Sequence, residues 1–244
     1  DDCEMLGNRN HMVLLLENLV NNALYYADQK SSKTRFRRVT ILQTLQPDQV
    51  VLEVYNQGQA IKEEDRERIF QLGYSSRRVR DHHGKGLGLY FVNEICKGFE
   101  GMVEFENIEN REDQLSLRIE LANGEVENHF VALVAENGKP LCRVADTEEQ
   151  PARSREWSFA GPISSIEISA QSSSEIQRIE ALADNSTSAY QDHSDPLLPT
   201  WSLDITNRSR SAKMLLRPID VRGVRFRARF PTAIARLEDR DGVF

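Results

Sequence analysis

The stretch Gly84-Lys85-Gly86-Leu87-Gly88-Leu89 runs directly into the apolar sequence Tyr90-Phe91-Val92-Asn93-Glu94-Ile95. This order predicts a glycine-rich loop that leads straight into a helix. Glycine lets backbone N–H groups approach a bound phosphate, and the positive end of the helix dipole favours an anion there. Glycines also make ordinary turns, so a phosphate site needs support from other parts of the chain.

The composition restricts the classes of function that this chain can have. Its 244 residues are enough for one large domain or two small ones, and a net charge of −7 argues against a general nucleic-acid-binding surface. No apolar stretch approaches the ~18 residues needed to span a bilayer, and the chain opens on acidic residues rather than on a signal peptide. The three cysteines lack metal-type spacing, which predicts reduced thiols and no zinc site. We therefore expect a cytoplasmic piece of a longer protein, with no direct membrane contact from this segment and any membrane anchor elsewhere.

A helix with one buried stripe is predicted for His11–Ala27, where apolar residues recur at three- and four-residue steps. Asn18 and Asn22 lie four residues apart and therefore share a face. Asparagine is a poor helix former because its side chain competes for backbone hydrogen bonds, so Asn18, Asn21 and Asn22 together cost stability. Two interpretations are open: a solvated polar face, or amide oxygens that face a hydrated Mg²⁺ and a triphosphate.

The segments between this helix and the glycine-rich loop predict a hairpin and two loops. Alternating apolar residues over Arg38–Tyr55 indicate two strands, and the second leads into the polar loop Asn56–Ile61. Such a loop either contacts a ligand or is an ordinary turn. A short helix with early acidic residues is expected at Glu63–Phe70. The basic, aperiodic segment Gln71–His83 is expected to be a mobile loop, which acts as a lid over phosphates or is only a surface loop.

Taken in order, these segments resemble the ATP-binding boxes of the sensor histidine kinases. Asn18–Ala23 is similar to their N box and Asn56–Ile61 to their G1 box. Ile69–Arg77 is similar to their F box and Gly84–Leu89 to their G2 box. The resemblance covers Gly7 to about Asn107. It implies the Bergerat ATP-binding fold, an α/β (α+β) two-layer sandwich of a mixed β-sheet packed on helices, with ATP and Mg²⁺ as cofactors.

The resemblance also implies roles for single residues. Asn22 matches the asparagine that contacts Mg²⁺, and Asn18 matches its partner near the phosphates. Asn56 stands where the family has an aspartate that accepts a hydrogen bond from the adenine amino group. The expected catalytic residues are Asn18, Asn22 and Arg77. The expected nucleotide-binding residues are Asn22, Asn56, Gly58, Ala60, Ile61, Phe70, Gly84, Lys85, Gly86, Leu87, Gly88 and Leu89.

The chain departs from the family pattern in the loop that should contact adenine. Asn56 is neutral where the family has an acid, and Gln57 and Ala60 loosen the match further. The amide oxygen of Asn56 still accepts a hydrogen bond. Replacing a charged carboxylate by this neutral amide weakens adenine binding by about 1 kcal/mol. An alternative is therefore a degenerate relative that holds nucleotide poorly and serves as a scaffold or regulatory binding module.

One position separates a kinase from a hydrolytic ATPase of the same fold. The true ATPases place a glutamate four residues before the Mg²⁺ asparagine, where it activates water. That position is Asn18 here, and the neighbouring Glu17 is rotated from it by about 100°. Without a general base, hydrolysis should be slow, which favours a protein-histidine kinase. Its phosphoacceptor histidine is expected on a helical dimerisation domain that is not in this chain, with a response regulator as a further partner.

The remaining sequence suggests an interrupted catalytic domain. We expect residues 1–121 to form its first part, including a strand at Leu115–Leu121, and residues 222–236 to carry its closing strand. Residues 122–221 are then a mainly-β insertion of unknown role, with polar, loop-like or partly disordered stretches at 164–174 and 184–199. A small β core is expected from Trp157, Trp201, Leu203, Ile205, Leu215 and Leu216.

Overall fold

Residues 7–28, 38–75, 86–180 and 185–241 are described by the structure, which is a computed structural model. The chain divides into two compact units. Unit 1 comprises Asp1–Ile108 and Arg222–Phe244, and unit 2 comprises Glu109–Val221. The second unit is therefore inserted between two segments of the first.

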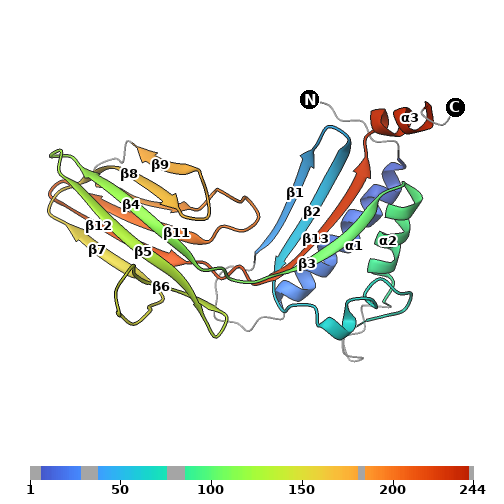
Figure 1. The fold of residues 1–244 in the computed structure, drawn as a ribbon, viewed down its shortest axis with the longest axis horizontal. Coiled ribbons are helices and arrows are strands. Elements are labelled where there is room, and N and C mark those ends of the chain that lie inside the picture. Colours follow the sequence, from blue (N-terminus) through green and yellow to red (C-terminus); the bar gives the residue numbers. More distant parts are fainter. Residues whose placement is uncertain (1–6, 29–37, 76–85, 181–184, 242–244) are drawn as a thin grey trace. The chain divides into compact units, whose positions relative to one another are not determined.

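Unit 1 is a four-stranded sheet with two helices on one face, in the strand order β1-β2-β13-β3 (Figure 1). Its described elements are α1 (Arg9–Asp28), β1 (Val39–Leu45), β2 (Gln49–Gln57), a 3₁₀ turn (Glu63–Asp65), α2 (Gly88–Gly98), β3 (Met102–Ile108), β13 (Gly223–Pro231) and α3 (Ala233–Asp241). This confirms the two-layer fold, the helix predicted at His11–Ala27 and the hairpin predicted at Arg38–Tyr55. All pairings between the described strands of this sheet are antiparallel.

The core of unit 1 lies between this sheet and the helices. On α1, the buried side chains of Leu15, Leu19 and Ala23 recur at four-residue steps and form the stripe that the sequence predicts. On β13, Phe226 and Phe230 point toward the helices, as strand periodicity requires. Because only one face is covered by helices, hydrophobic and polar residues alternate along this strand.

The other face of the sheet carries a ladder of ion pairs. Arg225, Arg227 and Arg229 of β13 alternate with its apolar residues. Arg227 bonds Glu53 of β2 at 2.9 Å and Glu104 of β3 at 3.1 Å, so the central strand is tied to both neighbours. Glu53 is buried, whereas Glu104 is more exposed, so the pairs of the ladder differ in solvent screening. Oppositely charged residues on neighbouring strands favour this strand register.

The segment after β2 differs from its prediction. The short helix expected at Glu63–Phe70 is a single 3₁₀ turn at Glu63–Asp65 followed by turns. Glu63 and Glu64 are exposed and pair locally, for example Glu63 with Arg66 at 3.0 Å, while Asp65 is half-buried. With no continuous apolar stripe to bury, the segment does not extend into a regular helix.

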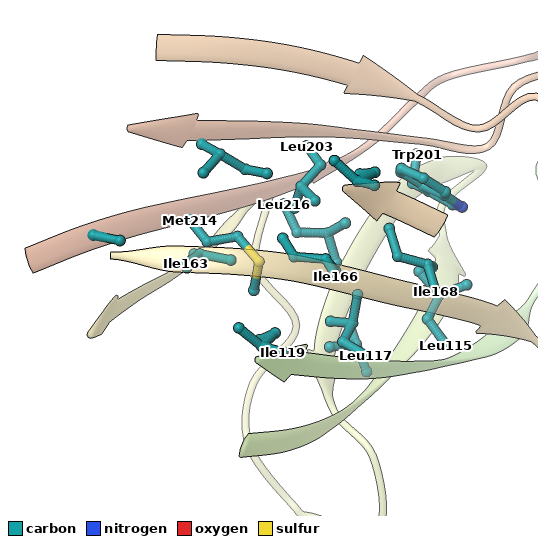
Figure 2. Packing of buried hydrophobic residues seen from close by; sticks show 14 of the residues in the cluster. Leu115, Leu117, Ile119, Ile163, Ile166, Ile168, Trp201, Leu203, Met214 and Leu216 are labelled. Atoms are coloured by element: carbon teal, nitrogen blue, oxygen red, sulfur yellow. The ribbon is translucent and has the colours of Figure 1, made fainter. Parts of the chain in front are cut away.

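Unit 2 is a β-sandwich. Its elements are β4 (Asp113–Leu121), β5 (Val126–Glu136), β6 (Lys139–Val144), β7 (Arg155–Phe159), β8 (Ile163–Ala170), β9 (Ile176–Glu180), β10 (Thr187–Gln191), β11 (Trp201–Arg208) and β12 (Ser211–Pro218). They form one sheet in the order β6-β5-β4-β8-β9 and a second in the order β10-β11-β12-β7. Apolar side chains from both sheets meet in one core, shown in Figure 2 with Trp201 and Leu203 facing residues such as Leu117 and Ile166.

The two ends of unit 2 are held together by one side chain. Oδ1 of Asn110 accepts the backbone N–H of Val221 at 2.9 Å, and Nδ2 of Asn110 lies 3.1 Å from Oδ1 of Asp220. The same Nδ2 donates to the carbonyl of Gly138 at 2.8 Å. The entry and exit segments of the insertion are therefore fixed next to each other.

Two predictions for this region were wrong, and a third was correct only in part. The strand at Leu115–Leu121 pairs with β5 and β8 and so belongs to unit 2, not to the catalytic sheet. The stretch 164–174 contains most of β8. The described part of the stretch 184–199 contains β10, while its other residues form the expected turns and loop. In β8, a register shift opposite Glu120 and Leu121 allows Ile163 and Ile166 both to be buried although they are three residues apart. This bulge hides the strand periodicity of two.

The β core itself was predicted well. Trp201, Leu203, Ile205 and Leu216 are buried in it, and Trp157 packs against it. Leu215 is only half-buried, because it lies on the opposite face of β12 from Leu216. Across the described residues, no helix combines the length and apolar character needed to cross a membrane.

Candidate nucleotide site

The asparagines of α1 meet the first residue of α2. A Cβ atom placed on Gly88 would lie 2.8 Å from Oδ1 of Asn18 and 3.7 Å from Nδ2 of Asn22. Nδ2 of Asn18 donates to the carbonyl of Leu14 at 2.8 Å, which orients the amide so that its oxygen faces Gly88. Residues far apart in sequence are thereby brought to one point, where two amide groups and a helix start converge.

Helix α2 begins at Gly88, directly after the N-cap residue Leu87, which makes no side-chain capping hydrogen bond. The N–H of Phe91 donates to the Leu87 carbonyl at 2.9 Å. N–H groups in the first turn of a helix have no partner within the helix. Together with the helix dipole they favour an anion such as a phosphate.

The glycine-rich loop is closely crossed by the segment that precedes it. Gly86 has φ +66°, and a Cβ there would lie 2.5 Å from the carbonyl oxygen of Tyr74. The N–H of Gly73 donates to the carbonyl of Gly86 at 3.1 Å. Only glycine fits at position 86, for reasons of both backbone conformation and space.

The loop after β2 carries the residues expected to contact adenine. Asn56 is 3% exposed, and its Nδ2 lies 3.5 Å from the Gln57 carbonyl, at the limit of a hydrogen bond. A Cβ on Gly58 would lie 3.0 Å from that amide nitrogen and 3.1 Å from the carbonyl oxygen of Tyr26 on α1. Ala60 is exposed and Ile61 is half-buried. The loop thus lies against the end of α1.

Other predicted residues lie in different surroundings. The ring of Phe70 packs in the core at 6.5 Å from the rings of both Phe105 and Phe226, so a packing role is evident. Leu87 and Leu89 are half-buried at the start of α2. The predicted site residues Arg77, Gly84 and Lys85 fall outside the described residues, as does most of the predicted lid.

Some contributors to this site were not predicted. Tyr26 and Asn107 contact the loop after β2, and Tyr74 crosses the glycine-rich loop. The Tyr74 hydroxyl donates to Asp65, and this hydrogen bond raises the pKa of Tyr74 above its ordinary value. In the sequence, the glycines of these loops are the only sign of the contacts that Tyr26, Asn107 and Tyr74 make. Within the described ranges, no group of three or more His, Cys, Asp or Glu side chains is placed to hold a metal ion.

Part of the chain is similar in sequence to known proteins. Residues 7–123 match the family described as "Histidine kinase-, DNA gyrase B-, and HSP90-like ATPase". The sensor protein CreC of Escherichia coli K12 is 30% identical over 104 residues, which cover 43% of this chain and 21% of that protein. The sensor histidine kinase CpxA of the same organism is 31% identical over 105 residues, which cover 42% of this chain and 21% of CpxA.

Two solved structures are also similar. The catalytic domain of the histidine kinase ThkA shares 27% identity over 43% of this chain and 64% of its own, with a TM-score of 0.37. The mycobacterial sensor histidine kinase MprB shares 18% identity over 57% of this chain and 76% of its own, with a TM-score of 0.36.

The part of unit 1 that lies within residues 7–123 is similar to ATP-binding domains of the histidine kinase type. The curated relatives that it matches are sensor kinases, and the chain spans about a fifth of the length of CreC and of CpxA.

Proposed function

We propose that unit 1 binds ATP and donates its γ-phosphate to a histidine on a separate helical domain, as part of a two-component sensor kinase. A response regulator is the proposed next partner. The observation that supports this most directly is the contact between the start of α2 at Gly88 and the amides of Asn18 and Asn22. Helix N–H groups and side-chain amides at one point suit a triphosphate.

The positions of the described site residues support the roles proposed for them. The first turn of α2 binds the phosphates, and Asn18 orients them from the opposite helix. The loop from Asn56 to Ile61 holds the adenine, with the Asn56 oxygen accepting the amino proton. Arg77, Gly84 and Lys85 are proposed to add phosphate contacts from the sequence resemblance alone.

Asn22 is the proposed Mg²⁺ ligand. Its amide lies beside the helix start where the phosphates are expected, which fits an ion that takes oxygen ligands from one protein group, the nucleotide and water. When bound, Mg²⁺ neutralises phosphate charge during transfer. Asn22 itself would supply the neutral oxygen of its side-chain amide from α1.

A kinase is proposed rather than a hydrolase because position 18 carries no carboxylate. The oxygen of Asn18 faces Gly88, and Glu17 is an exposed residue of α1. A general base must be within hydrogen-bond reach of the attacking water, which Asn18 cannot provide. We therefore expect slow phosphate release from the unaltered protein.

Calorimetry with an ATP analogue and Mg²⁺ tests the proposal on the whole chain. Asn22→Ala should weaken binding at least about tenfold, while the neighbouring exposed Asn21→Ala should bind as the unchanged protein does. Absence of binding at millimolar ligand would leave only the scaffold alternative that the neutral Asn56 raises. A phosphate-release rate that collapses in Asn18→Ala would instead indicate a hydrolase.

A further inference from the structure

Asn107, near the end of β3, holds both backbone polar groups of one loop residue. Its Oδ1 accepts the N–H of Ile61 at 2.9 Å, and its Nδ2 donates to the carbonyl of Ile61 at 2.7 Å. Both distances are those of good hydrogen bonds. An asparagine side chain carries one acceptor and one donor group, so this pair imitates the pairing of a neighbouring strand.

The residue that is held ends the loop proposed to contact adenine. Asn56 and Asn107 both pair with Val224, from opposite sides, in the register of β2, β13 and β3. Directly opposed residues in a sheet share a face, so both asparagines point to the helix side at the same end of the sheet. Asn107 thus stands two strands away from Asn56, and the loop crosses from one to the other.

The same loop is fixed at its beginning by different groups. The N–H of Gly58 donates to the carbonyl of Arg222 at 3.1 Å, and Gly58 lies against the carbonyl of Tyr26. Between these two anchor points, Gln59 and Ala60 are exposed and belong to no helix or strand. A loop with so few contacts opens easily unless both ends are tied.

We propose that Asn107 is a positioning residue that pre-orders the adenine loop before nucleotide binds. The inference rests on the proposed ATP site of unit 1. A ligand that must order a loop loses affinity to the entropy of ordering, and a loop already fixed avoids that loss. Asn107 acts through Ile61, so it favours the base of the nucleotide and leaves the phosphate contacts on α1 and α2 unchanged.

The test compares Asn107→Ala with a matched variant in unit 2. There Asn207 clamps Ile163 in the same way, with its Oδ1 accepting the N–H at 2.8 Å and its Nδ2 donating to the carbonyl at 2.8 Å. Calorimetry at low temperature on the full chain would measure Mg²⁺-ATP and Mg²⁺-tripolyphosphate binding. Asn107→Ala should weaken ATP about tenfold and leave tripolyphosphate unchanged, whereas Asn207→Ala should alter neither.

Hydrogen exchange on the nucleotide-free variants gives a second readout. The amides of residues 58–61 should exchange at least about tenfold faster in Asn107→Ala, while those of β2 keep their protection. Unchanged exchange, equal loss of both ligands, or an unchanged ATP affinity would each overturn the inference. If the unaltered protein binds no Mg²⁺-ATP, the proposed function itself fails, and that outcome is separate from the exchange result.

Discussion

Gly88 leaves space for the side chain of Asn18: a Cβ on Gly88 would stand 2.8 Å from Oδ1 of Asn18, closer than side chains tolerate. The amide of Asn18 is held in place by its hydrogen bond to the Leu14 carbonyl. The first residue of α2 and a residue in the middle of α1 therefore constrain each other. The two residues meet at the start of α2, where the phosphates are proposed to bind.

Gly88→Ala should damage binding more than stability. Alanine is the better helix former by up to about 1 kcal/mol, which offsets the cost of moving Asn18. We expect the free energy of unfolding to stay within about 1 kcal/mol, while the dissociation constant for Mg²⁺-ATP rises at least about tenfold. Gly98→Ala is the matched control, since a Cβ at position 98 meets nothing within 4 Å. Equal ATP affinity in both variants would remove Gly88 from the site.

Asn56→Asp should strengthen nucleotide binding. A carboxylate accepts the adenine amino proton in a charge-assisted hydrogen bond, which favours binding by about 1 kcal/mol, or about fivefold in affinity. Because Asn56 is only 3% exposed, the same change should destabilise the nucleotide-free protein by about 1–3 kcal/mol. Calorimetry and urea unfolding measure the two effects. Asn21→Asp adds the same charge at an exposed place on α1, and a gain in affinity there would point to a general charge effect.

Two buried cysteines report on the two units separately. Burial raises the pKa of the Cys96 thiol in α2 to about 12, and burial raises that of Cys142 in β6 to about 11. Both thiols are therefore protonated and shielded at neutral pH, and react only when their unit opens. In a Cys3→Ser background, saturating Mg²⁺-ATP should slow the labelling of Cys96, since a ligand stabilises the state that binds it. Cys142 should label at an unchanged rate, and equal protection of both thiols would show that the units open together.

Asp192 makes unit 2 sensitive to acid. Burial alone would raise the pKa of this carboxyl, but hydrogen bonds from Ser194, Thr200 and Gln177 outweigh burial and lower the pKa from its ordinary value. The folded state therefore binds this proton less readily than the unfolded state. Its stabilising contribution is fully present above about pH 4 and is lost as the pH falls through the lowered pKa.

Asp192→Asn should remove most of this dependence. The amide nitrogen would face groups that donate hydrogen bonds, so we expect a loss of about 2–4 kcal/mol in the free energy of unfolding of unit 2 at pH 7. Asp204→Asn, at an exposed carboxylate paired with Arg217, should cost less than about 1 kcal/mol. Urea unfolding between pH 3 and 7, followed by Cys142 labelling, would measure both variants. An identical pH profile for Asp192→Asn and the unaltered protein would contradict the assignment.

Local patterns in the sequence predicted the parts of unit 1 that local forces determine. The stripe of α1 and the alternation in β1 and β2 follow from burial on one face, so both were predicted correctly. The asparagines of α1 lower helix stability and bring no local benefit that the sequence shows. The structure places two of them, Asn18 and Asn22, beside the start of α2. Their roles toward nucleotide and Mg²⁺ stay predictions.

Long-range pairing could not be predicted in the same way. The alternation at Leu115–Leu121 indicates a strand with one buried face, but it does not say which sheet the strand joins. The clamp between Asn107 and Ile61 joins residues 46 positions apart, and nothing near either residue marks it. In β8, the bulge opposite Glu120 and Leu121 breaks the period on which strand prediction depends.

The place of β13 has a consequence for how the molecule is made. This strand lies between β2 and β3, yet the whole of unit 2 is synthesised between β3 and β13. Contacts that close such long loops form slowly, because chain entropy is lost before the contacts are gained. Once folded, the sandwich shortens the loop, since Asn110 joins its two ends. A mutation that keeps unit 2 from folding should therefore delay or prevent completion of the nucleotide-binding sheet, and so reduce ATP binding from a distance without altering any residue of the site.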